Sequence, residues 1–142
     1  MIERASLKDI DEIVSIENEC FAHPWTKDEF IEALGFDWCK IFVYREDDKI
    51  IGYLDIAYSL DFLELYNIAV KKELQGKGYG QKMLDFLFEE AKRVNAKKIF
   101  LEVRSGNKAY DLYLKNGFKE SRIRKNYYPD GDGIDMVKEL HD

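Results

Sequence analysis

The chain has 142 residues and carries 28 acidic and 22 basic side chains, so its formal net charge is −6 at pH 7. A chain of this length forms one compact domain and leaves no room for a second of ordinary size. Nine phenylalanines, nine tyrosines and two tryptophans exclude a disordered chain, which lacks the apolar surface that offsets the entropy of ordering. The acidic balance argues against duplex nucleic acid as a partner, because binding its phosphates requires a basic surface.

Metal sites and membrane segments are not indicated either. The two cysteines, Cys20 and Cys39, and the two histidines are too few and too widely spaced for a structural zinc site. No stretch approaches the roughly 20 apolar residues of a membrane span, and no charged start is followed by an apolar leader. We expect a soluble cytoplasmic protein with reduced thiols, no bound metal, no membrane partner and one domain over residues 1–142.

Two helices are predicted near the start of the chain, after a first short strand. Ser6 and Asp9 have the spacing of a capping box, with the aspartate in place of the usual glutamate. Residues at helical spacing follow from position 10 to position 17. Thr26 and Glu29 form a second capping box, and the helix that they open is expected to end before Gly35.

Further strands and two more helices are predicted after residue 40. The strand ranges are 41–44, 50–56, 63–70, 99–103, 118–127 and 134–140, and the first two form a hairpin around a polar turn. Residues 83–94 carry the clearest amphipathic helical pattern, and a short helix over 109–113 ends near Gly117. A strand–helix–strand unit implies one parallel pair between antiparallel hairpins. The fold class is therefore α+β, with a mixed, mostly antiparallel sheet of about seven strands and four helices.

A glycine-rich loop, Gln75-Gly76-Lys77-Gly78-Tyr79-Gly80, lies between the strand at 63–70 and the amphipathic helix. Glycines let an anion approach main-chain amides closely, and the start of a helix offers unpaired N–H donors and a positive dipole end. The loop therefore indicates a phosphate site. It lacks the Gly-Lys-Ser/Thr ending of a P-loop, and Gln81 replaces the third glycine of the dinucleotide fingerprint. An ordinary turn with spare glycines is the structural alternative.

Three stretches of the sequence resemble one enzyme superfamily. Gln75, Gly78 and Gly80 meet the pattern Gln/Arg-x-x-Gly-x-Gly, which is similar to the pyrophosphate loop of the Gcn5-related N-acetyltransferases. Leu112-Tyr113 and Asn116-Gly117-Phe118 resemble the helix that ends the next unit of that superfamily. Arg124-Lys125-Asn126-Tyr127-Tyr128-Pro129, together with Pro24-Trp25 and Glu64-Leu65, resembles its ribosomal-protein-alanine N-acetyltransferase branch. The resemblance covers nearly the whole chain. It implies that a bulge splays the central parallel strand pair, although the residues themselves do not show the bulge.

The resemblance also implies acetyl transfer from acetyl-CoA, a co-substrate, to the N-terminal alanine of a ribosomal protein. An α-amine has a pKa of about 8 and must lose a proton before it attacks, and Glu102 matches the family's general base. The leaving thiolate belongs to a group of pKa about 8.5, which a phenol can protonate, and Tyr113 matches the general acid. The residues implied to bind acetyl-CoA are Ile68, Ala69, Val70, Gln75, Gly76, Lys77, Gly78, Tyr79, Gly80, Gln81 and Asn107, and those implied to bind the acceptor are Trp25, Glu64, Tyr127 and Tyr128.

Several alternatives stay open from the sequence alone. Glu102 alternates with Arg104 on one strand face and is also explained as a solvated carboxylate paired with it. Tyr113 also fits a core aromatic, and the chain is one residue shorter than the family pattern from Asn107 to Tyr113, which leaves the role of Asn107 open. The acceptor is alternatively another protein N-terminus, a lysine or a small-molecule amine. A non-catalytic acyl-CoA-binding domain would need neither Glu102 nor Tyr113.

Overall fold

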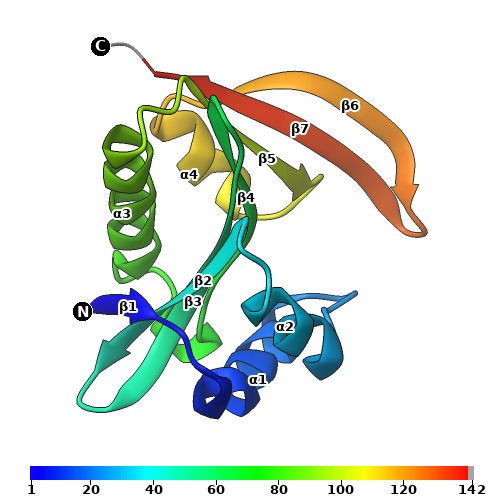
Figure 1. Ribbon diagram of the computed structural model, residues 1–142. Helices are drawn as coiled ribbons and strands as arrows, with labels where there is room; N and C mark the ends of the chain where they lie inside the picture. Colours follow the sequence, from blue (N-terminus) through cyan, green and yellow to red (C-terminus); the bar gives the residue numbers. More distant parts are fainter. Residues whose placement is uncertain (141–142) are drawn as a thin grey trace.

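Seven strands form one mixed sheet in the computed structural model, which describes residues 1–140 (Figure 1). In chain order they are β1 (Ile2–Arg4), β2 (Cys39–Glu46), β3 (Lys49–Tyr58), β4 (Phe62–Val70), β5 (Lys98–Arg104), β6 (Lys119–Tyr128) and β7 (Gly131–Glu139). Across the sheet the order is β1-β2-β3-β4-β5-β7-β6, and β4 and β5 are parallel while the other neighbours are antiparallel. The predicted mixed, mostly antiparallel sheet is confirmed.

Four α-helices cover the two faces of this sheet, as predicted. They are α1 (Ile10–Cys20), α2 (Lys27–Leu34), α3 (Tyr79–Arg93) and α4 (Ala109–Lys115). The helices α1 and α2 pack with the inward side chains of β2 and β3 in one apolar cluster. The helices α3 and α4 pack in a second cluster with the opposite face of the strands. We refer to these two sides of the sheet as the α1/α2 face and the α3/α4 face.

The parallel strands β4 and β5 pair only over their first halves. Phe62 lies opposite Lys98 and Leu65 opposite Leu101, after which the two strands diverge, as Figure 1 shows. At the same point Tyr66 is an extra residue in the pairing of β4 with β3, since Asp55 faces Asn67. Such a bulge bends a strand and increases its twist, which turns β4 away from β5. The predicted splay is confirmed, and the bulge, which the sequence did not reveal, accounts for it.

Local sequence signals explain where the first helices begin. Thr26 accepts a hydrogen bond from the Glu29 N–H at 3.2 Å, and the Glu29 carboxylate accepts one from the Thr26 N–H at 3.0 Å. This reciprocal pair is the predicted capping box of α2. The first box begins a 3-10 turn at Leu7–Asp9 before α1 starts at Ile10, so the predicted helix begins later than its cap suggested.

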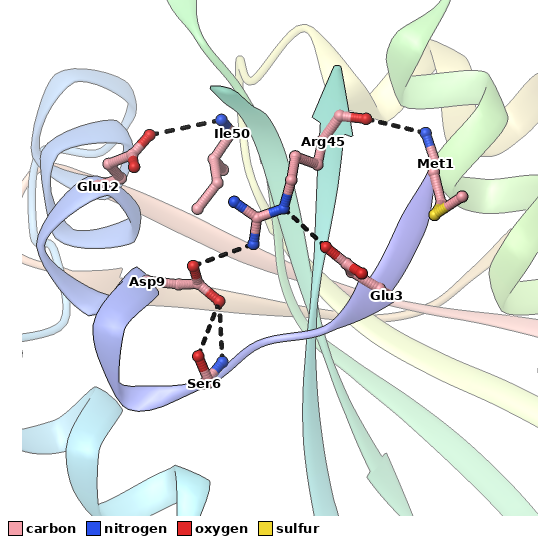
Figure 2. A network of polar contacts seen from close by, with 7 residues as sticks. All are labelled: Met1, Glu3, Ser6, Asp9, Glu12, Arg45 and Ile50. Carbon is pink, nitrogen blue, oxygen red and sulfur yellow. Dashed lines mark hydrogen bonds and ion pairs between the residues drawn. The ribbon is translucent and has the colours of Figure 1, made fainter. Parts of the chain in front are cut away.

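An ion-pair network fixes the N-terminal segment to the edge of the sheet (Figure 2). The Arg45 guanidinium donates to Glu3 at 2.7 Å and to Asp9 at 3.0 Å, and the other Asp9 oxygen accepts from the Ser6 N–H at 2.9 Å. Burial opposes the charge on Asp9, but these donors hold the pKa of its carboxyl below the ordinary value. The network thereby anchors the start of α1 to β2.

Residues 1–140 contain neither a candidate membrane-spanning helix nor a candidate cluster of metal ligands. No helix in this range is both long and apolar enough to cross a membrane. The same range contains no group of three histidine, cysteine or acidic side chains placed to hold a metal ion. Cys20 and Cys39 are free thiols, and Cys39 is buried.

Candidate functional site

The divergence of β4 from β5 leaves main-chain groups of β4 facing a gap in the sheet. The N–H of Lys71 donates to the Ile51 carbonyl of β3 at 2.9 Å. Main-chain groups in an antiparallel strand alternate in direction, so Ala69 also faces β3, whereas Ile68 and Val70 face the gap. Of the three predicted β4 residues, Ile68 therefore presents a main-chain donor and acceptor to the gap, and Ala69 presents neither. Val70 presents its N–H, while its carbonyl accepts from the Gln75 amide at 3.0 Å and from the Cys20 thiol at 3.3 Å.

The glycine-rich loop is open at the two positions where its backbone is left-handed. Gly76 has φ +79° and Gly78 has φ +93°, and a side-chain carbon added at either would meet nothing within 4 Å. Gly78 precedes the first residue of α3, and no side chain caps the unpaired N–H groups of the first turn. Unobstructed main-chain amides at a helix N-terminus fit a diphosphate, so this part of the structure suits the donor expected from the sequence.

The polar side chains around this loop hold it in place instead of filling it. The Gln75 amide donates to the Val70 carbonyl at 3.0 Å, and the Tyr79 hydroxyl donates to Glu46 at 3.0 Å. Gln81 exchanges two hydrogen bonds with Asn116, at 2.8 and 2.9 Å. The side chains of Gln75, Tyr79 and Gln81 are thus engaged within the protein, while Lys77 is exposed. Main-chain amides, and Lys77 among the side chains, remain available to an anion.

The two predicted catalytic side chains lie on opposite faces of the sheet. Ile99, Leu101 and Val103 point into the α3/α4 cluster, so Glu102 points to the α1/α2 face. Tyr113 lies on α4 and is buried in the same α3/α4 cluster. A base reachable from one face and an acid from the other suit a reaction in which the two reactants meet in the gap.

Glu102 is held by an aromatic residue of the β6–β7 hairpin. The Tyr128 hydroxyl donates to the Glu102 carboxylate, and burial, followed by this bond, raises the pKa of Tyr128. The Tyr128 ring stacks with His23 at 6.5 Å between ring centres and lies 5.1 Å from the Arg104 guanidinium. Arg104 itself pairs with Asp130. The alternative of a Glu102–Arg104 pair is therefore not what the structure shows.

A row of carboxylates crosses the α1/α2 face beside Glu102. Asp135 lies directly opposite Glu102 on β7, and Glu64 lies on β4. Burial raises the pKa of Glu64, and the negative charges of Glu102 and Asp135 raise it further. Asp135 is partly neutralised by Arg124, which donates to it at 3.0 Å. The acceptor side of the gap therefore favours a positively charged group such as an amine.

Tyr113 has a purely apolar setting. It packs edge-on against Phe118 with ring centres 5.7 Å apart, and only 5% of its surface is exposed. Burial raises the pKa of its phenol above the ordinary value. The phenol therefore keeps its proton at neutral pH, which is the form that a general acid requires.

The remaining predicted residues divide between the acceptor side and structural roles. The Asn107 side-chain oxygen accepts from the Ala109 N–H at 2.8 Å and so caps the start of α4. The Trp25 ring lies 6.3 Å from Tyr66, between the α1–α2 loop and the bulge. Tyr127 is half exposed beside Tyr128, with its ring 5.1 Å from the Arg124 guanidinium. Trp25, Tyr127 and Tyr128 thus border the α1/α2 face, while the observed bond of Asn107 is structural.

Glu17, which the sequence did not predict as a site residue, connects the α1–α2 loop to the bulge. Its carboxylate is 2% exposed and accepts from the Trp25 N–H at 2.9 Å, from the Asn67 amide at 3.3 Å and from the Tyr53 hydroxyl. Burial raises the pKa of Glu17 to about 7, against the opposing effect of the Trp25 N–H. The sequence offered one indication of this role, since Glu17 lies at the helical spacing of the apolar residues on the buried side of α1.

Asp55 is a second buried carboxyl beside the bulge. It lies opposite Asn67, and one of its oxygens accepts from the Cys39 thiol at 2.8 Å. Its other oxygen is the one buried side-chain polar atom without a partner among residues 1–140. Burial raises the pKa of Asp55 to about 6. The bulge is therefore surrounded by polar groups that are buried from solvent.

The chain matches one protein family and several characterised relatives. The sequence pattern of the acetyltransferase (GNAT) family matches residues 10–118. A Bacillus subtilis protein, provisionally named a [ribosomal protein bS18]-alanine N-acetyltransferase, is 37% identical over 131 residues, which are 91% of this chain and 87% of that protein. The [ribosomal protein bS18]-alanine N-acetyltransferase of Haemophilus ducreyi is 34% identical over 134 residues, 94% of this chain and 92% of its own.

Solved structures share the same architecture. The crystal structure of the ribosomal-protein-S18-alanine N-acetyltransferase from Escherichia coli superposes with a TM-score of 0.92 at 30% identity, covering 100% of this chain and 94% of that one. A GNAT family acetyltransferase from Elizabethkingia anophelis, solved with acetyl-CoA bound, superposes with a TM-score of 0.79 at 21% identity over 99% and 97% of the two chains. The second likeness concerns the fold alone.

The raised pKa of Glu17 predicts a pH-dependent stability. Between the ordinary carboxyl pKa of 4.5 and the folded value of about 7, the folded protein binds more protons than the unfolded chain. Stability should therefore fall as the pH rises through this window, by about 1 to 3 kcal/mol for this group. Glu17→Gln removes this contribution. Urea unfolding at pH 5 and pH 7.5 should show a smaller pH-dependent loss in Glu17→Gln than in the wild type.

The exposed carboxylate of Glu89 on α3 provides the control for this measurement. Glu89→Gln should unfold with the pH dependence of the wild type, because its side chain is 74% exposed. An identical pH dependence in Glu17→Gln and the wild type would show that Glu17 is ionised normally in the folded protein.

Proposed function

Because the chain belongs to the acetyltransferase (GNAT) family, we propose that it transfers the acetyl group of acetyl-CoA to the N-terminal alanine of a ribosomal protein. The observation that carries the chemistry is the gap between β4 and β5, with Glu102 on one face and Tyr113 on the other. The acceptor follows from the names of relatives that match this chain over most of their length. We place this activity in the cytoplasm and assign it to one N-acetyltransferase domain over residues 1–142.

The donor side is formed by the glycine loop and the end of β4. Main-chain amides from Gln75 to Gln81 hold the diphosphate of acetyl-CoA, and the main-chain groups of Ile68 and Val70 hydrogen-bond its pantetheine arm. This arrangement brings the thioester to the gap. An N–H near Val70 then donates to the thioester oxygen as negative charge develops on it, which lowers the barrier to attack.

The acceptor side supplies the base. Glu64, Glu102 and Asp135 attract the protonated α-amine, and Glu102 accepts its proton, directly or through water. The neutral nitrogen attacks the thioester carbon from the α1/α2 face. The new C–N bond gives a tetrahedral intermediate, whose nitrogen releases its second proton to solvent. The C–S bond then breaks, and the Tyr113 hydroxyl gives its proton to the departing sulfur. The products are the acetylated N-terminus and coenzyme A. Solvent returns one proton to Tyr113, and the proton held by Glu102 is the net proton released.

Detection of the product by intact mass tests the acceptor assignment. Peptides that begin with alanine should gain one acetyl group when incubated with the protein and acetyl-CoA. The same peptides with a blocked N-terminus and an internal lysine should gain none. Modification of the blocked peptides would assign the protein to lysine acetylation, and modification of small amines alone would exclude a protein acceptor.

Substitution of the two catalytic residues should reduce turnover and spare donor binding. Glu102→Gln keeps an acceptor for the Tyr128 hydroxyl, and Tyr113→Phe keeps the packing on Phe118. We expect each variant to lose about 100-fold or more in kcat, because each removes a proton-transfer group. The dissociation constant for acetyl-CoA, measured by calorimetry, should stay within about twofold of the wild type. Wild-type turnover in either variant would remove that residue from the mechanism.

A substitution in the glycine loop should have the opposite effect and weaken donor binding. Gly78→Val places a branched side chain in the open space over the main-chain amides, so we expect acetyl-CoA affinity to fall about tenfold or more. Gly106→Val is the matched control, since Gly106 has φ +89° and equally open surroundings outside the loop. Comparable affinity losses in the two variants would trace the effect to backbone strain and not to a blocked anion site.

A further inference from the structure

An aromatic pocket with an acidic rim lies beside the acceptor side of the gap. It has a volume of about 140 Å³ and lies between α2 and the bulge of β4. Its lining includes four aromatic rings and two carboxylates, which belong to Trp25, Phe36, Trp38, Tyr66, Glu29 and Glu32. The rings of Trp38 and Tyr66 are 46% and 36% exposed, which is unusual for large apolar side chains with no partner to cover them.

The rings border the pocket on two sides. Phe36 and Trp38 stack at 4.8 Å between centres, and Trp38 meets Tyr66 nearly at a right angle at 6.3 Å. Trp25 closes the other side, 6.3 Å from Tyr66. Its main chain is held by Glu17, so the wall is formed before any ligand binds. Ring faces within about 6 Å of a bound cation attract it through their quadrupoles.

The carboxylates at the rim have no cationic partner among residues 1–140. Glu29 and Glu32 are one turn apart on α2, and both are exposed. One Glu29 oxygen takes part in the capping box of α2. No lysine, arginine or histidine of residues 1–140 forms an ion pair with either glutamate. The pocket therefore combines aromatic faces with uncompensated negative charge, which favours a cationic side chain over a neutral or acidic one.

The pocket lies close to the position that we assign to the acceptor amine, because Glu64 at that position and Tyr66 in the pocket wall belong to the same strand. Tyr66 follows Glu64 by two residues on β4, a separation of about 7 Å along a strand. Glu64, Glu102 and α2 all lie on the α1/α2 face. The bulge that parts β4 from β5 also supplies Tyr66 to the pocket wall. An acceptor chain whose first residue sits at Glu64 and Glu102 can therefore extend its next side chains toward the pocket.

We propose that this pocket binds the lysine or arginine side chain of the second or third residue of the acceptor peptide. The proposal rests on the proposed function and adds a requirement for a basic residue next to the acetylated end. It accounts for exposed aromatic rings and unpaired carboxylates that the transfer chemistry does not use.

A peptide panel measures this preference. The peptides begin with alanine and differ at position two or three, where they carry lysine, methionine or glutamate. Methionine matches the length of the lysine stem without its charge. We expect kcat/KM to be about tenfold higher for lysine than for methionine at one of the two positions, chiefly through KM, and lowest for glutamate. Equal kcat/KM for lysine and methionine at both positions, or a preference for methionine, would overturn the proposal while leaving the acetyltransferase activity in place.

Substitutions in the pocket should abolish the preference. Glu32→Gln changes an exposed side chain, and Trp38→Leu removes one wall, so each should reduce the lysine-to-methionine ratio to less than about threefold. Asp28→Asn is the control, because Asp28 is an exposed carboxylate of α2 that does not line the pocket, and the ratio should stay at the wild-type value. A wild-type ratio in Glu32→Gln would exclude the pocket as its source. No acetylation of any peptide would defeat the proposed function and this proposal together.

Discussion

The bulge at Tyr66 is the constraint on which the rest of the structure depends. One extra residue in β4 ends its pairing with β5 after Leu65 and leaves the N–H and carbonyl of Ile68 and the N–H of Val70 without a neighbouring strand. The cost of leaving such groups unpaired is acceptable only where a ligand or solvent satisfies them. The same bulge places Asn67 on Glu17 and Tyr66 beside Trp25, so one local irregularity positions both the donor side and the acceptor side.

The two faces of the sheet offer different environments to the two reactants. The α3/α4 face offers uncapped main-chain amides and a buried phenol, which suit an anionic donor and a departing sulfur. The α1/α2 face offers carboxylates, which suit an amine. Tyr128 joins Glu102, the proposed base, to the α1–α2 loop, since its hydroxyl donates to the Glu102 carboxylate and its ring stacks with His23. Tyr128 therefore connects the β6–β7 hairpin both to Glu102 on β5 and to the α1–α2 loop.

The sequence predicted the strands, the helices and the glycine loop because each has a local signal. Periodicity marks α3, the Thr26 and Glu29 pair marks α2, and the glycines mark the turn before Tyr79. The family resemblance implied the bulge, but the residues themselves did not show it, because it depends on how β4 pairs with β3, and no residue of β4 requires it. Glu17 was missed for a similar reason. A carboxylate in an apolar pattern does not reveal which distant N–H groups it accepts from.

Amide hydrogen exchange resolved by NMR tests the central claim most directly, because it reads the gap residue by residue. In the free protein the amides of Ile68 and Val70 should exchange much faster than that of Ala69, which is bonded to β3. Saturating acetyl-CoA should slow Ile68 and Val70 and leave Ala69 nearly unchanged. If Ile68 and Val70 are already protected without the donor, or do not respond to it, then β4 and β5 do not form the reaction site described for this protein.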